Sequence, residues 1–352
     1  MHILADNFGV TMKKFAISVK LLSISLLVYL IVSAVLIACP VSRGVPEADY
    51  DFNALSGVED FPEGAWIRVE MRDGHEVFYR YFDSTSKNLL IFLHGSGSDS
   101  RYLRDMAATI ASQGLADVVL PDLRGHGRSA ERMGDIDYIG QLEDDLDELI
   151  EYSANRYLSE KVFLGGHSMG GGLVLRYAGN RGLKNIGGLI LLAPYLGHTA
   201  PTHKPNNANW ITVNVKRIIG LSMLHNIGIR FLNDLPVFYF NRPPEWEDEL
   251  LPNNYSYRLA MNFSPNSYVT DIQAITKPAL VVVGNSDESF YADKFEGMFK
   301  PVEDKVKLKI IEGVRHLEIV DNEKSRDAIS SWLSNIAEDS IETKEWILPP
   351  GY

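Results

Sequence analysis

The feature that most constrains the fold is an alternation, from Trp66 onward, of short apolar segments with longer amphipathic ones. This pattern is typical of a mostly parallel β-sheet whose strands are connected by helices. The predicted strands are 66–72, 76–82, 88–94, 117–121, 161–166, 188–193, 279–284 and 306–311, and the predicted helices lie near 101–113, 139–157, 169–180, 290–299 and 323–337. Asp73-Gly74 predicts a hairpin between the first two strands. The sequence therefore predicts an α/β fold with an eight-stranded, mostly parallel sheet and helices on both faces.

A long segment separates the predicted strands 188–193 and 279–284. Because a structureless loop of that length is uncommon in a compact domain, we expect a helical cap at this position, with an apolar face supplied by Ile211 to Phe240. The expected organisation is a signal peptide or membrane anchor at 1–39, a linker at 40–64, a core formed by 65–194 and 271–338, the cap at 195–270, and a C-terminal tail at 339–352.

The N-terminal segment carries no charge from Leu21 to Ala38 and is preceded by Lys13, Lys14 and Lys20. Such a run is typical of an export signal or a membrane anchor, whereas a buried core helix would show polar residues at helical spacing. The lysines predict that the N-terminal side of the run stays in the cytoplasm. We therefore expect the rest of the chain to lie outside the cytoplasm, attached to a membrane.

Cys39, the only cysteine of the chain, ends this run. Leu36-Ile37-Ala38-Cys39 resembles the lipobox of bacterial lipoproteins, in which the cysteine is lipidated and becomes the mature N-terminus. The competing interpretation is an anchor helix that is not cleaved. Both interpretations predict the same topology.

Composition excludes several classes of function. The chain has 34 Lys and Arg against 46 Asp and Glu, a net charge of -12, so it lacks the positive surface that nucleic-acid binding requires. A single cysteine excludes a disulfide framework and a cysteine-based metal site. The acidic residues of 143–148 could suggest a metal cluster, but their helical spacing favours the solvated face of a helix. The residues expected on its buried side are Leu142, Leu146 and Leu149.

The pentapeptide Gly166-His167-Ser168-Met169-Gly170 stands between a predicted strand and a predicted helix. This context predicts a tight turn that exposes the Ser168 hydroxyl, with glycines where the strand and helix approach too closely for a side chain. A serine hydroxyl becomes a nucleophile when a base accepts its proton and an acid orients that base. The motif therefore requires a histidine and a carboxylate elsewhere in the chain.

Both partners are found in loops that follow later strands. His316 follows the strand 306–311, and Asp287 follows the strand 279–284. Because parallel strands end at one edge of a sheet, we expect Ser168, Asp287 and His316 to converge there. Glu288, next to Asp287, is the alternative acid.

The developing oxyanion of such a reaction needs preorganised N–H donors. One candidate is the backbone of Met169, at the start of the helix that follows the nucleophile. The other is the backbone of Ser96, in the sequence His94-Gly95-Ser96-Gly97 after the strand 88–94.

Together with Asp122-Leu123-Arg124-Gly125-His126-Gly127-Arg128-Ser129, these motifs resemble the alpha/beta hydrolase superfamily over Trp66 to Ile336. The set is most similar to the monoacylglycerol lipase and lysophospholipase branch, which carries a cap at the same position. In this superfamily the Asp122–Ser129 stretch has a structural role. The resemblance implies an alpha/beta hydrolase fold and hydrolysis of carboxylic esters, lipid-like ones in this branch, through an acyl-enzyme on Ser168. It implies no metal and no organic cofactor.

The alternatives are an acyltransferase or peptidase that uses the same triad, and a non-catalytic surface binding protein. The segment 196–270 holds one more basic than acidic residue, and it contains Trp210, Phe231, Phe238, Tyr239, Phe240 and Trp246. These aromatic residues either form an acyl-chain site under an apolar lid or pack the cap onto the core.

Overall fold

The computed structural model describes residues 2–44, 63–205, 209–243, 246 and 248–345, and the side chains between 14 and 336 within those ranges. All eight predicted strands are present in one sheet, in the order β1-β2-β4-β3-β5-β6-β10-β11. β1 and β2 form the expected antiparallel hairpin, β2 pairs antiparallel with β4, and the remaining pairs are parallel. The strands are β1 (Ala65–Glu70), β2 (Glu76–Phe82), β3 (Asn88–Leu93), β4 (Asp117–Pro121), β5 (Lys161–His167), β6 (Gly188–Leu192), β10 (Ala279–Gly284) and β11 (Val306–Ile311).

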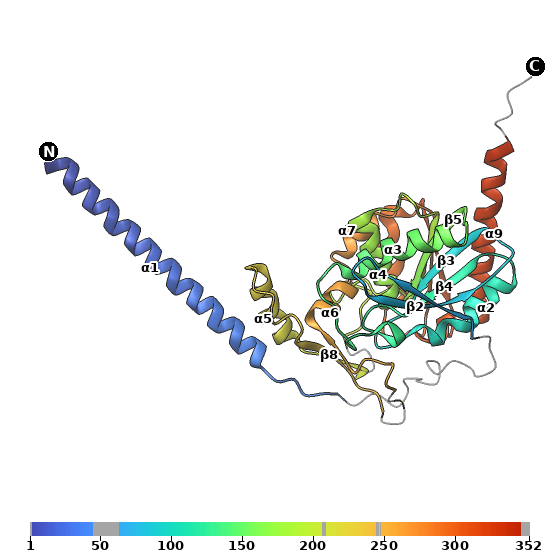
Figure 1. Cartoon of the computed structure of the whole chain (residues 1–352), viewed down its shortest axis with the longest axis horizontal. Coiled ribbons are helices and arrows are strands. Elements are labelled where there is room, and N and C mark those ends of the chain that lie inside the picture. Colours follow the sequence, from blue (N-terminus) through green and yellow to red (C-terminus); the bar gives the residue numbers. More distant parts are fainter. Residues whose placement is uncertain (1, 45–62, 206–208, 244–245, 247, 346–352) are drawn as a thin grey trace, which may run out of the picture.

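Helices cover both faces of this sheet, as predicted (Figure 1). α2 packs against α9 on one face, and α3 packs against α4 on the other. The helices are α2 (Arg104–Ser112), α3 (Gln141–Arg156), α4 (Met169–Arg181), α8 (Phe295–Phe299) and α9 (Glu323–Glu345). α9 extends past the predicted end near 337 into the segment expected to be a tail.

The helix predicted over 290–299 begins later than expected. A 3₁₀ turn covers Ala292–Lys294, and the α-helix covers only Phe295–Phe299. The backbone N–H of Phe290 donates to Asp287, and that of Tyr291 donates to the carbonyl of Thr202. Phe290 also forms an antiparallel bridge with His203, and Tyr291 is extended at φ -82° and ψ 99°, so helical backbone begins only after Tyr291.

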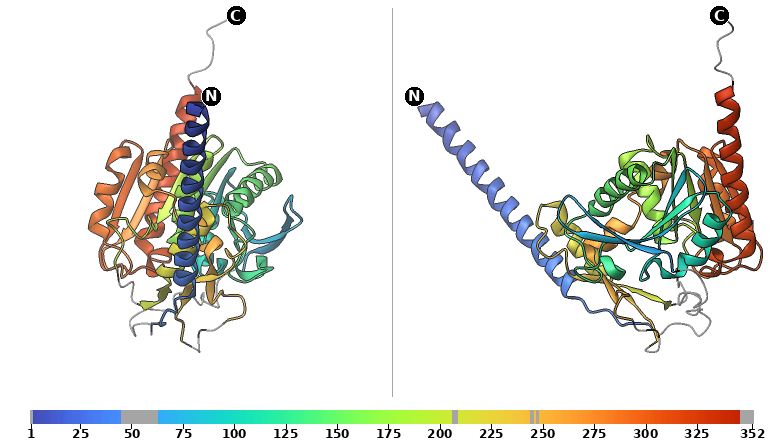
Figure 2. Two further views of the ribbon diagram at one scale, coloured as in Figure 1. Left: turned by 90° about the vertical axis from the view of Figure 1, so that its left-hand side faces the viewer. Right: turned by 45° about the vertical axis from the view of Figure 1, so that its right-hand side comes forward.

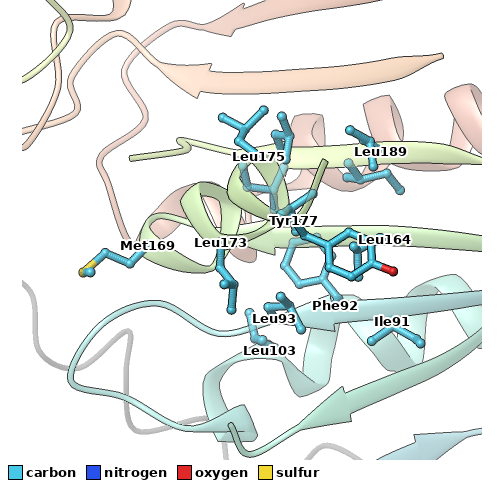
Figure 3. Packing of buried hydrophobic residues seen from close by; sticks show 14 of the residues in the cluster. Ile91, Phe92, Leu93, Leu103, Leu164, Met169, Leu173, Leu175, Tyr177 and Leu189 are labelled. Atoms are coloured by element: carbon cyan, nitrogen blue, oxygen red, sulfur yellow. The ribbon is translucent and has the colours of Figure 1, made fainter. Parts of the chain in front are cut away.

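The central strands are buried on both sides, because helices cover both faces of the sheet. Every residue of β6 and β10 is buried, as are the last five of β3. Figure 3 shows Leu173 of α4 next to Leu93 of β3 and Leu103, one turn along α4 from Met169, the residue after Ser168. This packing gives the C-terminal edge of the sheet a rigid base.

The insertion between β6 and β10 contains the expected helices: α5 (Val215–Asn226), α6 (Tyr257–Phe263) and α7 (Tyr268–Gln273). It also contains a small antiparallel sheet where only helices were expected, formed by β7 (Ile211–Val213), β8 (Pro236–Phe240) and β9 (Asn254–Ser256). β8 is rich in aromatic and β-branched residues, which favour strands over helices. The cap is therefore mixed in secondary structure.

The acidic face of α3 corrects an expectation. The three leucines of α3 are buried as predicted, but Glu143 and Asp145 are buried as well. Glu143 pairs with Arg176, and Asp145 pairs with Arg124. A buried carboxylate needs such a partner, so this part of the acidic run anchors α3 to neighbouring segments instead of facing solvent. Among the described residues there is no group of three or more potential ligands that could hold a metal ion.

The N-terminal segment forms α1 (His2–Ala38), of which Lys14–Ala38 is long and apolar enough to cross a membrane. Figures 1 and 2 show α1 extending away from the folded domain, with its C-terminal part beside α5. Most of the expected linker, residues 45–62, and the last residues of the expected tail, 346–352, lie outside the described part of the chain.

Candidate active site

Ser168 occupies a sharp turn between β5 and α4, as predicted. Its φ of 53° lies in the left-handed region, which a non-glycine residue adopts rarely. A Cβ at Gly166 would lie 2.4 Å from the carbonyl carbon of Gly170, and a Cβ at Gly170 would lie 2.5 Å from the carbonyl oxygen of His94. Only glycine fits at either position, so the two glycines allow the turn to form.

The loops after β10 and β11 bring Asp287 and His316 to Ser168. His316 Nε2 lies 2.9 Å from Ser168 Oγ, and His316 Nδ1 lies 2.7 Å from Asp287 Oδ2. The other oxygen of Asp287 accepts from the backbone N–H groups of Ser289 and Phe290, each at 2.8 Å. The structure thus places the three residues in the order that a hydroxyl, a base and an orienting acid require. Their catalytic roles stay predictions.

Glu288, the alternative acid, contacts a different part of His316. Its carboxylate accepts from the backbone N–H of His316 at 3.0 Å, and it pairs with Arg315. The geometry therefore favours Asp287 as the partner of the imidazole ring. It also shows that Glu288 is bonded to the loop that carries His316. From the sequence, Glu288 was considered only as an alternative to Asp287 for the role of the acid.

The surroundings of His316 raise the pKa of its imidazole ring. Burial lowers the pKa of the imidazole, but the charge of Asp287 and its hydrogen bond raise the pKa more, and the charge of Glu288 adds to the increase. The resulting pKa lies above the usual value of 6.5. Such a ring is a stronger base than an isolated histidine.

Two backbone N–H groups next to Ser168 are available as oxyanion donors. The amides of Gly95 and Gly97 donate to the hydroxyls of Tyr102 and Tyr255, whereas the amide of Ser96, between them, has no partner in the described part of the chain. Met169 is the first residue of α4, where no intrahelical partner exists for an N–H. Ser96 and Met169 line the same cavity as Ser168.

A buried network that sequence reasoning missed joins this site together. The Tyr102 hydroxyl accepts from Gly95 N–H at 2.7 Å and donates to His167 Nδ1 at 2.9 Å. His167 Nε2–H donates to the carbonyl of His316 at 3.0 Å. Burial, together with the nearby His316, holds the pKa of His167 well below its usual value, so the ring is neutral. His167, the residue before Ser168, thus connects two loops. One is the loop 94–97, named the oxyanion loop here for the role predicted of Ser96, and the other is the loop that carries His316.

The cap holds the oxyanion loop from the other side. Tyr255 of β9 accepts from Gly97 N–H at 2.6 Å, and the Arg242 guanidinium donates to the carbonyl of Gly97. The Tyr255 hydroxyl also lies 2.5 Å from His126 Nε2. No local sequence signal points to these residues, because Tyr255 lies 158 positions from Gly97.

The segment Asp122–Ser129 acts away from the cavity. The carboxylate of Asp122 accepts from the backbone N–H of Ser100 at 3.0 Å and from that of Arg128 at 2.9 Å. Asp122 is buried, and no residue of the segment lines the cavity. These contacts agree with the structural role that the sequence resemblance implied.

A cavity of about 1160 Å³ lies over Ser168, between the core and the cap. Its apolar lining includes Ile139, Ile211, Val213, Ile218, Met223 and Phe238. Among the described residues that line the cavity, none is an aspartate or a glutamate. Polar groups such as Arg176, His198 and Asn209 also line the cavity, but most of its lining surface is apolar.

The cap aromatics divide between the two interpretations left open above. Trp210 and Phe238 are buried and line the cavity, whereas Phe240 packs against Trp210 and Tyr255. Phe231 does neither, since it is 79% exposed.

Cys39 lies just past the end of α1, where its carbonyl accepts from the side chain of Asn214 at 3.2 Å.

Comparison with known proteins shows the family of this chain. A family described as serine aminopeptidase, S33 matches residues 84–324, more than half of the chain. Protein phosphatase methylesterase 1 of Bos taurus is 26% identical over 147 residues, which are 42% of this chain and 38% of that protein. Monoglyceride lipase of Homo sapiens is 29% identical over 160 residues, which are 45% of this chain and 50% of the lipase. The chain thus matches half or less of the length of these two relatives.

A solved structure extends the similarity to the whole fold. The crystal structure of Paleococcus ferrophilus monoacylglycerol lipase superposes with a TM-score of 0.56 at 22% identity, covering 74% of this chain and 99% of the lipase. At this level of identity the comparison shows the shared fold.

Proposed function

The chain belongs to the serine aminopeptidase, S33 family and has the alpha/beta hydrolase fold, and from this premise we propose that it hydrolyses carboxylic esters through Ser168, His316 and Asp287. The observation that carries the proposal is the arrangement of His316, with Nε2 at 2.9 Å from Ser168 Oγ and Nδ1 at 2.7 Å from Asp287. This arrangement lies at the base of a largely apolar cavity.

The proposed reaction has two steps. Ser168 Oγ attacks the ester carbonyl carbon while His316 Nε2 accepts the hydroxyl proton. The N–H groups of Ser96 and Met169 stabilise the oxyanion, and His316 then donates its proton to the departing alcohol oxygen. Water, deprotonated by His316, attacks the acyl carbon of the acyl-enzyme. The bond between this carbon and Ser168 Oγ then breaks, His316 returns the proton to Oγ, and the acid is released. Each step uses groups of the chain itself.

A lipid-like ester, such as a monoacylglycerol or a lysophospholipid, is the substrate class we propose. The cavity of about 1160 Å³ is large for a small ester, and most of its lining surface is apolar. An acyl chain fills such a space and removes its own apolar surface from water. Monoglyceride lipases among the similar proteins agree with this class.

The peptidase alternative is supported by the description of the family. An aminopeptidase binds the free ammonium group of its substrate, and a cation taken out of water needs a carboxylate partner. Among the described residues of the cavity lining there is no such carboxylate. An ester with an uncharged acyl chain fits the lining better.

The N-terminal segment supports a proposal about location. α1 contains a stretch, Lys14–Ala38, that can cross a membrane, and lysines precede its apolar part. We propose a membrane-attached enzyme whose catalytic domain lies outside the cytoplasm.

The test uses the purified full-length chain in detergent. It should react with a fluorophosphonate probe and cleave p-nitrophenyl esters, with kcat/KM increasing from short to long acyl chains, and it should release fatty acid from monoacylglycerol or lysophospholipid. Failure to react with the probe would indicate a non-catalytic protein. Faster cleavage of aminoacyl p-nitroanilides than of any ester would indicate a peptidase, and transfer of most acyl groups to an added alcohol would indicate an acyltransferase.

A further inference from the structure

Cap helix α5 lies side by side with the C-terminal part of α1 (Figures 1 and 2). At one end of the contact the Arg217 guanidinium donates to the carbonyl of Ile37 at 3.0 Å. At the other end the Tyr29 hydroxyl donates to the carbonyl of Met223 at 2.7 Å. Tyr29 and Ile37 are eight residues apart, so the two helices run antiparallel along each other for about 12 Å.

The two helices approach each other closely at Gly220, in the middle of α5. A Cβ at this position would lie 2.7 Å from the carbonyl oxygen of Ser33 and 2.8 Å from Cγ1 of Ile37. Ser33 is completely buried, although most of α1 is exposed. Small residues at the contact let two helices approach closely, which is how helices associate inside a bilayer.

The position of this contact along α1 determines how deep the contact lies in a membrane. The uncharged run Leu21–Ala38 is about 27 Å long as a helix, close to the roughly 30 Å of a hydrocarbon core. Tyr29 to Ile37 form the half of that run nearer the catalytic domain. A helix packed along this half lies at the depth of the acyl chains of the adjacent leaflet.

Several apolar side chains of α5 and of the turn after it are exposed. Val215 and Ile219 on α5 are 57% and 47% exposed, and Ile227 and Phe231 beyond its end are 45% and 79% exposed. The polar contact of Arg217 is level with Ile37, next to the end of the apolar run, where the membrane surface begins. Lys216, Asn226, Arg230 and Asp234 of the same segment are exposed as well. The apolar side chains thus gain a lipid environment, whereas the charged ones must reach the headgroup level.

The same face of α5 borders the cavity over Ser168. Val215 and Ile219 line this cavity and are also about half exposed. The edge of the cavity therefore coincides with the face of the cap that would contact lipid.

We propose that α5 is embedded in the leaflet next to the catalytic domain by direct packing on α1, and that the cavity receives its acyl substrate laterally from that leaflet. The substrate part rests on the proposed function. The proposal makes α1 a structural partner of the cap, and it requires that α1 remain part of the mature protein.

The first test measures depth directly. Phe231→Cys and Leu158→Cys are each introduced into the Cys39→Ser chain, so that one nitroxide is attached in the cap and one on the core, at sites with nearly equal exposure of 79% and 82%. In phosphatidylcholine vesicles, oxygen should relax the nitroxide at 231 more than a water-soluble nickel chelate does. The nickel chelate should relax the nitroxide at 158 more than oxygen does. Equal nickel access at both sites would overturn the proposal. So would a mass spectrum of the membrane-bound chain that keeps Cys39, if it showed that the residues before Cys39 are absent.

The second test separates α1 from α5. Gly220→Leu should expel α1 from α5, whereas Gly297→Leu is the matched control, because a Cβ at Gly297 meets no atom within 4 Å. We expect Gly220→Leu to lower hydrolysis of a long-chain monoacylglycerol in vesicles about tenfold, with a short, water-soluble p-nitrophenyl ester cleaved within about twofold of the unmodified rate. Equal loss on both substrates, or no loss on either, would overturn the lateral route.

The two proposals fail in different ways. If the unmodified chain cleaves neither ester, the proposed function fails, while the nitroxide measurement still decides whether α5 is embedded. If both esters are cleaved but the label at 231 is accessible to nickel, the proposed function stands and the membrane placement of α5 is wrong.

Discussion

His167 Nε2 lies 3.0 Å from the carbonyl oxygen of His316, so the residue before Ser168 is bonded to the backbone of the residue that faces Ser168 Oγ. A carbonyl only accepts, which requires the proton of His167 on Nε2 and leaves Nδ1 as an acceptor. The Tyr102 hydroxyl must then donate to Nδ1, and its oxygen is free to accept from Gly95 N–H. The direction of every bond in this chain is thereby determined, and three loops of the site are held in one arrangement.

Tyr102→Phe tests this network. The change leaves the Gly95 N–H and His167 Nδ1 unpaired in a buried site, which costs about 1–3 kcal/mol and lets the oxyanion loop move. We expect kcat for a short ester to fall about tenfold, with KM changed little. The control is Tyr79→Phe, which removes another buried tyrosine hydroxyl, bonded to Tyr157 at 2.8 Å and remote from the cavity. If both variants lose thermal stability and kcat equally, the network has only a general structural role.

Ser168→Ala tests the nucleophile. The hydroxyl supplies the bond-forming atom and little packing, so kcat should fall by a factor on the order of a thousand or more while the melting temperature is retained. Ser153→Ala is the control, because Ser153 is fully buried and does not line the cavity. Turnover by Ser168→Ala close to that of the unmodified enzyme would exclude the mechanism.

The two carboxylates next to His316 should differ in effect. Asp287→Asn removes the acceptor that orients the ring and stabilises the imidazolium, and we expect a loss of kcat on the order of a thousandfold or more. Glu288→Gln keeps an oxygen that can accept from His316 N–H, so a loss below about tenfold is expected. Steady-state kinetics of the two variants compare the roles directly. The opposite ranking would assign the acid to Glu288.

The pH profile should reflect the raised pKa of His316. The mechanism needs the neutral ring, so kcat/KM should fall as the solution becomes acidic, with a midpoint above 6.5. Removing a nearby negative charge makes the imidazolium less stable and releases its proton at lower pH. Glu288→Gln should therefore move the midpoint down, and the residual activity of Asp287→Asn should show a larger shift in the same direction. A midpoint that rises in either variant would contradict this electrostatic account.

Cys39→Ser distinguishes the two interpretations of the N-terminus. If α1 remains attached, the membrane-bound protein should keep its mass apart from the substitution and should stay in the membrane fraction. If Cys39 is lipidated instead, the substitution should block processing and a longer precursor should accumulate. Intact mass spectrometry of the membrane fraction, with the unmodified chain in parallel, provides the measurement.

Sequence patterns alone determined most of the core fold. Strands and helices follow from local periodicity, and the carboxyl ends of parallel strands meet at one edge of a sheet whatever the loops contain. That rule was sufficient to bring Ser168, Asp287 and His316 together. The turn at Ser168 was equally local, because two glycines within five residues create the space it needs.

Tertiary structure decided what depends on contacts between distant segments. Glu143 was expected to face solvent, and only the position of Arg176 shows that it is buried in an ion pair. The hydroxyl of Tyr255 reaches Gly97 from 158 positions away. Helical periodicity identifies which face of a helix is apolar, but it does not identify what covers that face. The packing of Gly220 against Ser33 therefore became visible only when α1 and α5 were placed side by side.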